Sequence, residues 1–167
     1  MKKFTIILSF MLIFLVSCVC ADSYSDIQTP FMLVETEDEF GDKTGIFRLG
    51  AVCSGEFSNT ATTDSELGAV VFVDDKNTCY LTIYEYMSYQ VSFYRDDLIF
   101  SVKDGKGEKT SFTVKTSGSS SKFVDCNKLI PLLKKEGILK VVIKKGTTTY
   151  KFSIDATNFN ELYGKLK

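Results

Sequence analysis

The chain has 167 residues, with 20 Lys and Arg against 21 Asp and Glu, which gives a formal net charge of −1. Histidine is absent, and this excludes a Ser-His-Asp or Cys-His catalytic device and every His-ligated metal site. Without Lys2 and Lys3, 18 basic residues remain against 21 acidic ones, with no basic stripe, so nucleic acid is not an expected partner.

The first 21 residues predict an exported protein. Two lysines precede an apolar run, Phe4–Val16, that suits a secretory signal peptide and is too short to span a bilayer. Residues 15–18, Leu-Val-Ser-Cys, resemble a bacterial lipobox. This resemblance implies that Cys18 carries a lipid and anchors the protein to a membrane of the bacterial cell envelope. The alternative is cleavage after Ala21, which would give a soluble periplasmic or secreted protein.

The rest of the chain is interpreted as a polar tether, residues 22–30, and a single β-rich domain, residues 31–167. Short runs rich in β-branched and aromatic residues are separated by turn residues about every ten positions, which is typical of antiparallel strands. Strands are expected at residues 31–35, 46–57, 67–73, 79–86, 89–94, 98–103, 110–115, 138–144 and 149–155.

Two short helices are expected in the C-terminal third. Asp125 can cap a helix over residues 126–136, which Pro131 keeps short or kinks. Asn158 and Glu161 resemble a capping box for the last helix, whose apolar positions recur at helical spacing. The fold class predicted is mainly β: an antiparallel β-sandwich or flattened barrel of about eight to nine short strands, with a split α+β sheet as the alternative.

Three cysteines lie beyond the leader, at positions 53, 79 and 126. Cys79 alternates in register with Leu81 and Ile83, so its side chain is expected to point inward. One interpretation treats all three cysteines as small buried hydrophobic residues. The other is a single disulfide, for which Cys53 and Cys79 are the candidate pair in an oxidising compartment.

Three segments carry a resemblance to known proteins. Residues 38–45 (Asp-Glu-Phe-Gly-Asp-Lys-Thr-Gly), 55–62 (Gly-Glu-Phe-Ser-Asn-Thr-Ala-Thr) and 83–86 (Ile-Tyr-Glu-Tyr) resemble a pattern in small uncharacterised bacterial secreted and lipoprotein domains. The resemblance covers residues 31–103 and implies an all-β envelope domain without an established activity. Members often carry Trp ahead of the first segment, where this chain has Phe-Met-Leu at 31–33.

The first segment has two interpretations. Asp38, Glu39 and Asp42 could offer oxygen ligands to Ca²⁺, although their spacing is not that of an EF-hand. The alternative is a tight turn in which Gly41 takes a positive φ and the acids accept local N–H groups. The Ser- and Thr-rich stretch at 58–63 is expected to satisfy backbone groups of an ordered loop rather than to supply a nucleophile.

The third segment offers candidate binding residues. In an extended strand Tyr84 and Tyr86 share one face and, with Tyr89, form either an aromatic platform for a partner or part of the core. Glu85 would point to the opposite, inward face and need a partner such as Arg48 or Arg95.

The sequence therefore favours a non-enzymatic envelope or surface lipoprotein that binds a protein, peptide or glycan, or has a structural role. No catalytic residue, metal or cofactor is assigned. One alternative is a glycan-acting enzyme that uses two carboxylates among Asp38, Asp42 and Glu85. Another is an inhibitor-like lipoprotein acting through the loop at residues 58–66.

Overall fold

The structure is a computed structural model that describes residues 29–166, except for 77, 95, 117–118 and 121–125. The predicted leader with Cys18, most of the tether, Arg95 and the expected cap Asp125 lie outside the described residues. The described elements, in chain order, are β1 (Met32–Glu37), β2 (Lys43–Ser58), β3 (Ser65–Asp74), β4 (Cys79–Glu85), β5 (Tyr89–Gln90), β6 (Phe93–Tyr94), β7 (Asp97–Lys103), β8 (Lys109–Lys115), β9 (Ser119–Ser120), α2 (Cys126–Leu133), β10 (Ile138–Lys145), β11 (Thr148–Asp155) and α3 (Phe159–Lys165).

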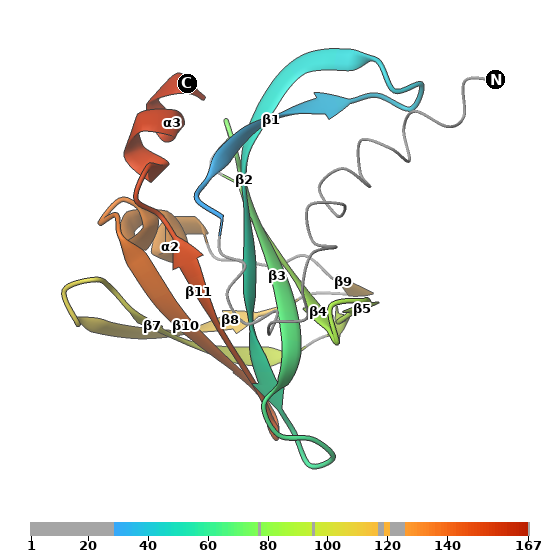
Figure 1. Ribbon diagram of the computed structural model, residues 1–167, viewed down its shortest axis with the longest axis vertical. Coiled ribbons are helices and arrows are strands. Elements are labelled where there is room, and N and C mark those ends of the chain that lie inside the picture. The colour runs from blue at the N-terminus through green and yellow to red at the C-terminus, as the bar shows by residue number, and fades with distance from the viewer. Residues whose placement is uncertain (1–28, 77, 95, 117–118, 121–125, 167) are drawn as a thin grey trace, which may run out of the picture.

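Nine strands form one antiparallel sheet in the order β5-β4-β3-β2-β11-β10-β7-β8, with β1 also paired to β2. The sheet is not closed into a barrel. We call β1–β5 the first leaf and β7, β8, β10 and β11 the second leaf. The leaves meet at one end and diverge toward the other, where α2 and α3 lie (Figure 1). The mainly β, antiparallel fold with two short C-terminal helices is therefore confirmed.

The seam between the leaves is short. β2 pairs with β11 only from Gly55 to Ser58, although β2 runs for 16 residues. A Cβ atom on Gly55 would lie 2.0 Å from the carbonyl oxygen of Lys151, so only glycine lets the two backbones approach this closely. Farther along, Thr29 fills the fork between the strands. Its N–H donates to the Val52 carbonyl oxygen at 3.1 Å, and Pro30 forms a parallel bridge with Asp155.

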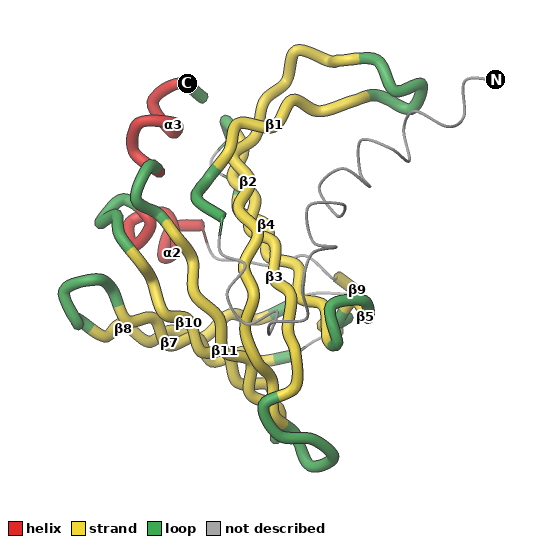
Figure 2. Tube along the Cα trace, in the orientation of Figure 1, coloured by secondary structure: helices red, strands yellow, loops and turns green. Residues whose placement is uncertain are grey.

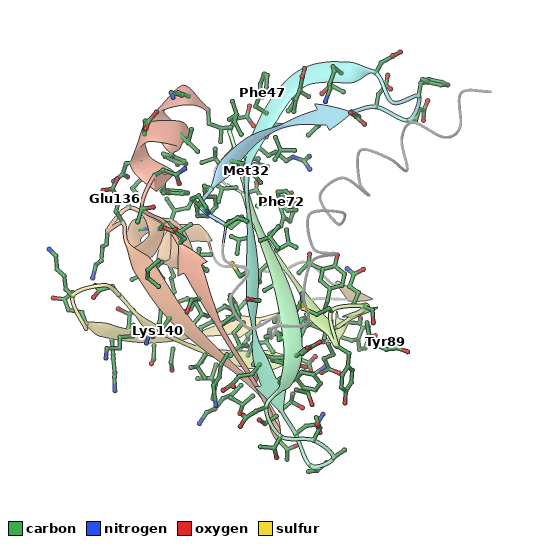
Figure 3. All side chains as sticks on the ribbon, viewed as in Figure 1. Met32, Phe47, Phe72, Tyr89, Glu136 and Lys140 are labelled. Carbon is green, nitrogen blue, oxygen red and sulfur yellow. The ribbon has the colours of Figure 1, made fainter. Side chains whose placement is uncertain are left out.

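The beginning of β2 extends past the first leaf. Its residues pair with β1 from Lys43 onward, whereas pairing with β3 begins only at Arg48. The result is a two-stranded arm that projects from the body, with Phe47 on the arm and Met32 at its base (Figure 3).

Three of the connections between neighbouring strands share one turn design. Asp38, Asp74 and Asp104 begin the β1–β2, β3–β4 and β7–β8 turns. Figure 2 shows the β1–β2 and β7–β8 turns as green loops on opposite sides of the molecule. In each turn the Asp N–H donates to the carbonyl of the residue four positions later, at 2.9–3.0 Å. The same Asp carboxylate accepts the N–H of that later residue, at 2.6–2.9 Å. This pattern closes the turn and satisfies its backbone without any partner from elsewhere.

The core lies between the leaves and under the helices. It joins alternate residues of β2, β3, β4, β7, β10 and β11 with the buried faces of α2 and α3. α2 ends at Leu133, earlier than predicted, and it contains Pro131. On α3 the apolar positions Phe159, Tyr163 and Leu166 are buried and Leu162 is partly buried against the core. Phe159 packs edge-to-face on Phe31 at 5.0 Å between ring centroids.

The predicted capping box at α3 is wrong. Asn158 occupies the N-cap position but makes no side-chain cap hydrogen bond. Its amide reaches Phe31 instead: Oδ1 accepts the Phe31 N–H at 3.1 Å, and Nδ2 donates to the Phe31 carbonyl at 2.8 Å. Glu161 pairs with Lys165 one turn later. The Asn158 side chain thus ties the helix to the start of the domain, a long-range use that local spacing does not reveal.

Candidate binding surface

Glu85 and Tyr150 connect the two leaves at the seam. β4 alternates, as predicted, with Cys79, Leu81 and Ile83 buried, so Glu85 follows on the inward face. The Tyr150 hydroxyl, from β11, donates to Glu85 Oε1 at 3.0 Å. Burial, and next the nearby Glu85 carboxylate, raise the pKa of Tyr150 above its ordinary value, so this hydroxyl stays a donor at neutral pH.

The prediction that Arg48 is the partner of Glu85 is wrong. Arg48 pairs with Asp74 at one end of the β2–β3 ladder, whereas Glu85 pairs with Leu67, whose partner on β2 is Gly55, at the other end. Arg95 lies outside the described residues. The inward position of Glu85 was correct, but the group that meets it is a phenol delivered by a strand far away in sequence.

A row of five rings runs from solvent into the core: Tyr89, Tyr86, Phe57, Tyr150 and Phe93. We call it the aromatic row. Neighbouring ring centroids are 6.4, 5.0, 6.3 and 6.3 Å apart in that order. Tyr89 is 71% exposed and Tyr86 50%, whereas the other three are buried. Aromatic contacts of this kind add stabilisation beyond burial, so the exposed pair is braced by a fixed support.

The backbone turns sharply where the exposed rings begin. β4 ends at Glu85, and Tyr86 and Met87 take positive φ values of 50° and 58°. Bulky residues rarely adopt this left-handed conformation, and the strain is held by the Tyr86 N–H donating to the Glu66 carbonyl at 2.8 Å. The expectation that Tyr84 and Tyr86 share one strand face is therefore wrong: Tyr84 stays half-buried on the strand, and Tyr86 swings out.

The loop between β2 and β3 lies at the same end. Asn59 Oδ1 accepts the N–H groups of Ala61 and Thr62, and Ser58 and Asp64 bond to each other twice. The polar side chains thus order the loop, as predicted. Because β3 leads from this loop to Glu66, beside Tyr86, the second and third sequence segments come together here. The exposed Tyr89 projects outward beside the β4–β5 turn (Figure 3).

The first segment lies elsewhere, at the tip of the arm. Asp38 Oδ1 accepts the N–H groups of Phe40 and Asp42, both at 2.9 Å, and Gly41 takes a φ of 85°. This is the predicted tight turn. Within the described part of the chain, no three acidic or cysteine side chains are arranged to hold a metal, so Asp38, Glu39 and Asp42 form no cation site there. Asp38 and Asp42 also lie at the opposite end of β2 from Glu85, too far apart to act with it as a catalytic pair.

The candidate disulfide between Cys53 and Cys79 is not formed. β3 runs between the two strands that carry them, and two strand spacings already amount to about 10 Å, beyond the reach of a disulfide. Cys53 pairs with Ala69, whereas Cys79 pairs with Val73, farther along the same strand. Both side chains are buried, and burial raises the pKa of the Cys53 thiol to about 12. The side chain of Cys126 is outside the described set.

Comparison with known proteins adds no relative. No family model, no curated protein and no solved structure matches this chain. The resemblance carried by the three segments therefore stays a prediction. A search of the described helices finds none long and apolar enough to cross a membrane.

Proposed function

We propose that this chain is a non-enzymatic lipoprotein of the bacterial cell envelope that binds a partner through the exposed end of its aromatic row. The observation that carries this proposal is the exposed pair Tyr86 and Tyr89, in which the Tyr89 ring contacts Tyr86 and the Tyr86 ring contacts the buried Phe57. Tyrosines held in this way lose little conformational entropy when they bind, which is why such residues dominate protein interfaces.

The surroundings of these rings favour a peptide or protein over a small molecule. The ordered β2–β3 loop leads to Glu66, whose carbonyl accepts the Tyr86 N–H, and the half-buried Met87, next to Tyr86 in the chain, packs on Gly68, with its sulfur 3.3 Å from where a Cβ on Gly68 would lie. An aromatic pair flanked by a thioether and hydroxyl-rich turns matches the mixed apolar and polar composition of an interface core and rim.

The anchor is tested first by the intact mass and detergent partitioning of the native protein beside a Cys18→Ala variant. A mass increase of diacyl or triacyl size that the variant lacks supports the lipoprotein assignment. A mature chain that starts at Asp22 without modification refutes it and leaves a soluble exported protein.

The binding surface is tested with a photoreactive aromatic residue at position 89 in intact cells. We expect one discrete crosslinked species, which disappears when Tyr86→Asn is added. Asn tolerates positive φ, so this change removes the ring without straining the turn. The matched control places the same probe at Phe40, which is 78% exposed at the arm tip. Equal crosslinking from both positions, or crosslinking that Tyr86→Asn leaves unchanged, would refute the proposal.

A further inference from the structure

Three lysines stand side by side on the outer face of the second leaf. Lys140 of β10 pairs with Lys103 of β7, and Lys103 pairs in turn with Lys109 of β8. All three are exposed, and strand neighbours such as Val141 and Val102 point into the core. Lys140 lies on the side of β10 away from the first leaf (Figure 3). We call this set the lysine row.

No acid compensates the lysine row from within the described part of the chain. The described ion pairs involve other lysines, among them Lys135 with Asp104 and Lys145 with Asp96. Like charges placed directly opposite each other destabilise a sheet. The sequence expectation of no basic stripe was therefore wrong, because pairing of distant strands aligns lysines that are scattered along the chain.

The row belongs to a wider separation of charge between the leaves. Residues 29–94 hold three Lys and Arg against 11 Asp and Glu, a net charge of −8. Residues 96–167 hold 14 Lys against eight acids, a net charge of +6. The small overall charge thus hides an acidic first leaf and a basic second one. Such an arrangement orients a protein at a charged surface.

Exposed aliphatic side chains are interleaved with these lysines. Ile138 lies two residues before Lys140 on the same face of β10 and is 39% exposed. Ile99 of β7 pairs with Lys144 and is 49% exposed. A soluble polyanion would gain nothing from these isoleucines. A lipid surface engages both kinds of group, since ammonium groups meet the phosphates while aliphatic groups enter the headgroup boundary.

The described chain also begins beside this face. Pro30 bridges Asp155, and Asp155 pairs with Ile138 at the start of β10. Thr29 lies 11 residues after Cys18, a separation that spans at most about 40 Å when the chain is fully extended. A lipid on Cys18 would therefore hold the lysine row within reach of the bilayer that it enters.

We propose that the outer face of β7, β8 and β10 docks on a membrane rich in anionic phospholipid, with the lysine row against the headgroup phosphates and Ile99 and Ile138 at the boundary. The proposal rests on the membrane attachment proposed above, to which it adds a second, electrostatic contact. In this orientation the acidic first leaf, which carries Tyr86 and Tyr89, is turned away from the negative surface.

The test measures binding of the full chain to vesicles in a Cys18→Ala background, which removes the lipid. Vesicles of phosphatidylcholine with 30% phosphatidylglycerol are compared with pure phosphatidylcholine over a series of salt concentrations. The variant is K103Q/K109Q/K140Q. The matched control is K43Q/K76Q/K165Q, which removes the same charge elsewhere. The leader is common to all proteins, so its contribution cancels.

We expect the parent and the control to prefer the anionic vesicles and to lose this preference as salt rises. Removing three lysines from the row should weaken the partition coefficient by roughly 100-fold. Equal loss in the control variant, no preference for anionic vesicles, or tighter binding to duplex DNA than to the vesicles would overturn the proposal. If the mass of the native protein shows no lipid while the Cys18→Ala protein still binds anionic vesicles through the lysine row, this inference stands and only the anchor is refuted.

Discussion

Removing the Tyr150 hydroxyl with Tyr150→Phe tests the contact between the leaves. The ring stays against Phe57 and Phe93, so only the hydrogen bond to Glu85 is lost. A hydrogen bond to a charged group contributes about 1.5–3 kcal/mol, but Glu85 is half-buried and water partly replaces the donor. We therefore expect the free energy of unfolding to fall by about 1–2 kcal/mol at pH 7.

The raised pKa of Tyr150 makes this difference depend on pH. Below pH 10 the phenol is neutral in both the folded and the unfolded state. Above pH 10 it ionises first in the unfolded chain, so the stability that it contributes is lost at about 1.4 kcal/mol per pH unit. By pH 11 the parent and Tyr150→Phe should therefore have nearly the same free energy of unfolding.

Urea unfolding curves measured from pH 7 to pH 11 check both statements. Glu85→Gln serves as the conservative control, because its amide oxygen still accepts the Tyr150 hydroxyl. The pair Glu85→Ala and Tyr150→Phe completes a double-mutant cycle, for which we expect a coupling of about 1 kcal/mol. If the stability losses of Glu85→Ala and Tyr150→Phe are strictly additive, the contact does not join the leaves as described. The same holds if the stability difference between the parent and Tyr150→Phe stays constant to pH 11.

Three further changes have defined outcomes. Gly55→Ala forces a Cβ onto the Lys151 carbonyl and should cost more than about 3 kcal/mol or prevent folding, whereas Gly105→Ala, with open space around it, should be nearly neutral in the same denaturation assay. Between pH 9 and pH 11 the free energy of unfolding of the parent should fall by about 1.4 kcal/mol per pH unit more than that of Cys53→Ala. The reason is that the thiol ionises in the unfolded chain, whereas the buried thiol of the folded protein resists ionisation until about pH 12. Parallel stability–pH profiles would contradict this. Lys103→Glu turns two repulsive cross-strand pairs into attractive ones and should raise the thermal midpoint, with a gain of about 0.5–1 kcal/mol, while it weakens binding to anionic vesicles; a loss of stability would count against the register of the lysine row.

Local signals in the sequence were sufficient for the elements and most turns. Strict alternation located β7 and β8, and Gly107, at a φ of 87°, lies in the turn predicted between them. Alternation also placed Cys79 and Glu85 on the inward face of β4. It failed where the backbone left the extended conformation: the expected strand at 89–94 splits into β5 and β6, and Tyr86 leaves the strand at a positive φ.

The candidate sites depend on contacts that no local pattern encodes. Tyr150 meets Glu85 because β11 pairs with the far end of β2, and the lysine row exists because β10, β7 and β8 lie side by side. One signal for the seam was present in the chain. Gly55 lies inside the strand expected at 46–57, and a glycine within a strand is typical of a close backbone approach, but its partner could not be identified without the topology.

The shared turn design also bears on the order in which the chain folds. Asp38, Asp74 and Asp104 each close a short loop, so three hairpins can form within microseconds from neighbouring residues alone. The seam at Gly55 must instead bring together segments separated by most of the domain, and the entropy of closing that long loop delays it. The hairpins should accordingly form before the leaves dock. Substitutions at the turn aspartates should then mainly slow folding, and substitutions at the seam should mainly accelerate unfolding.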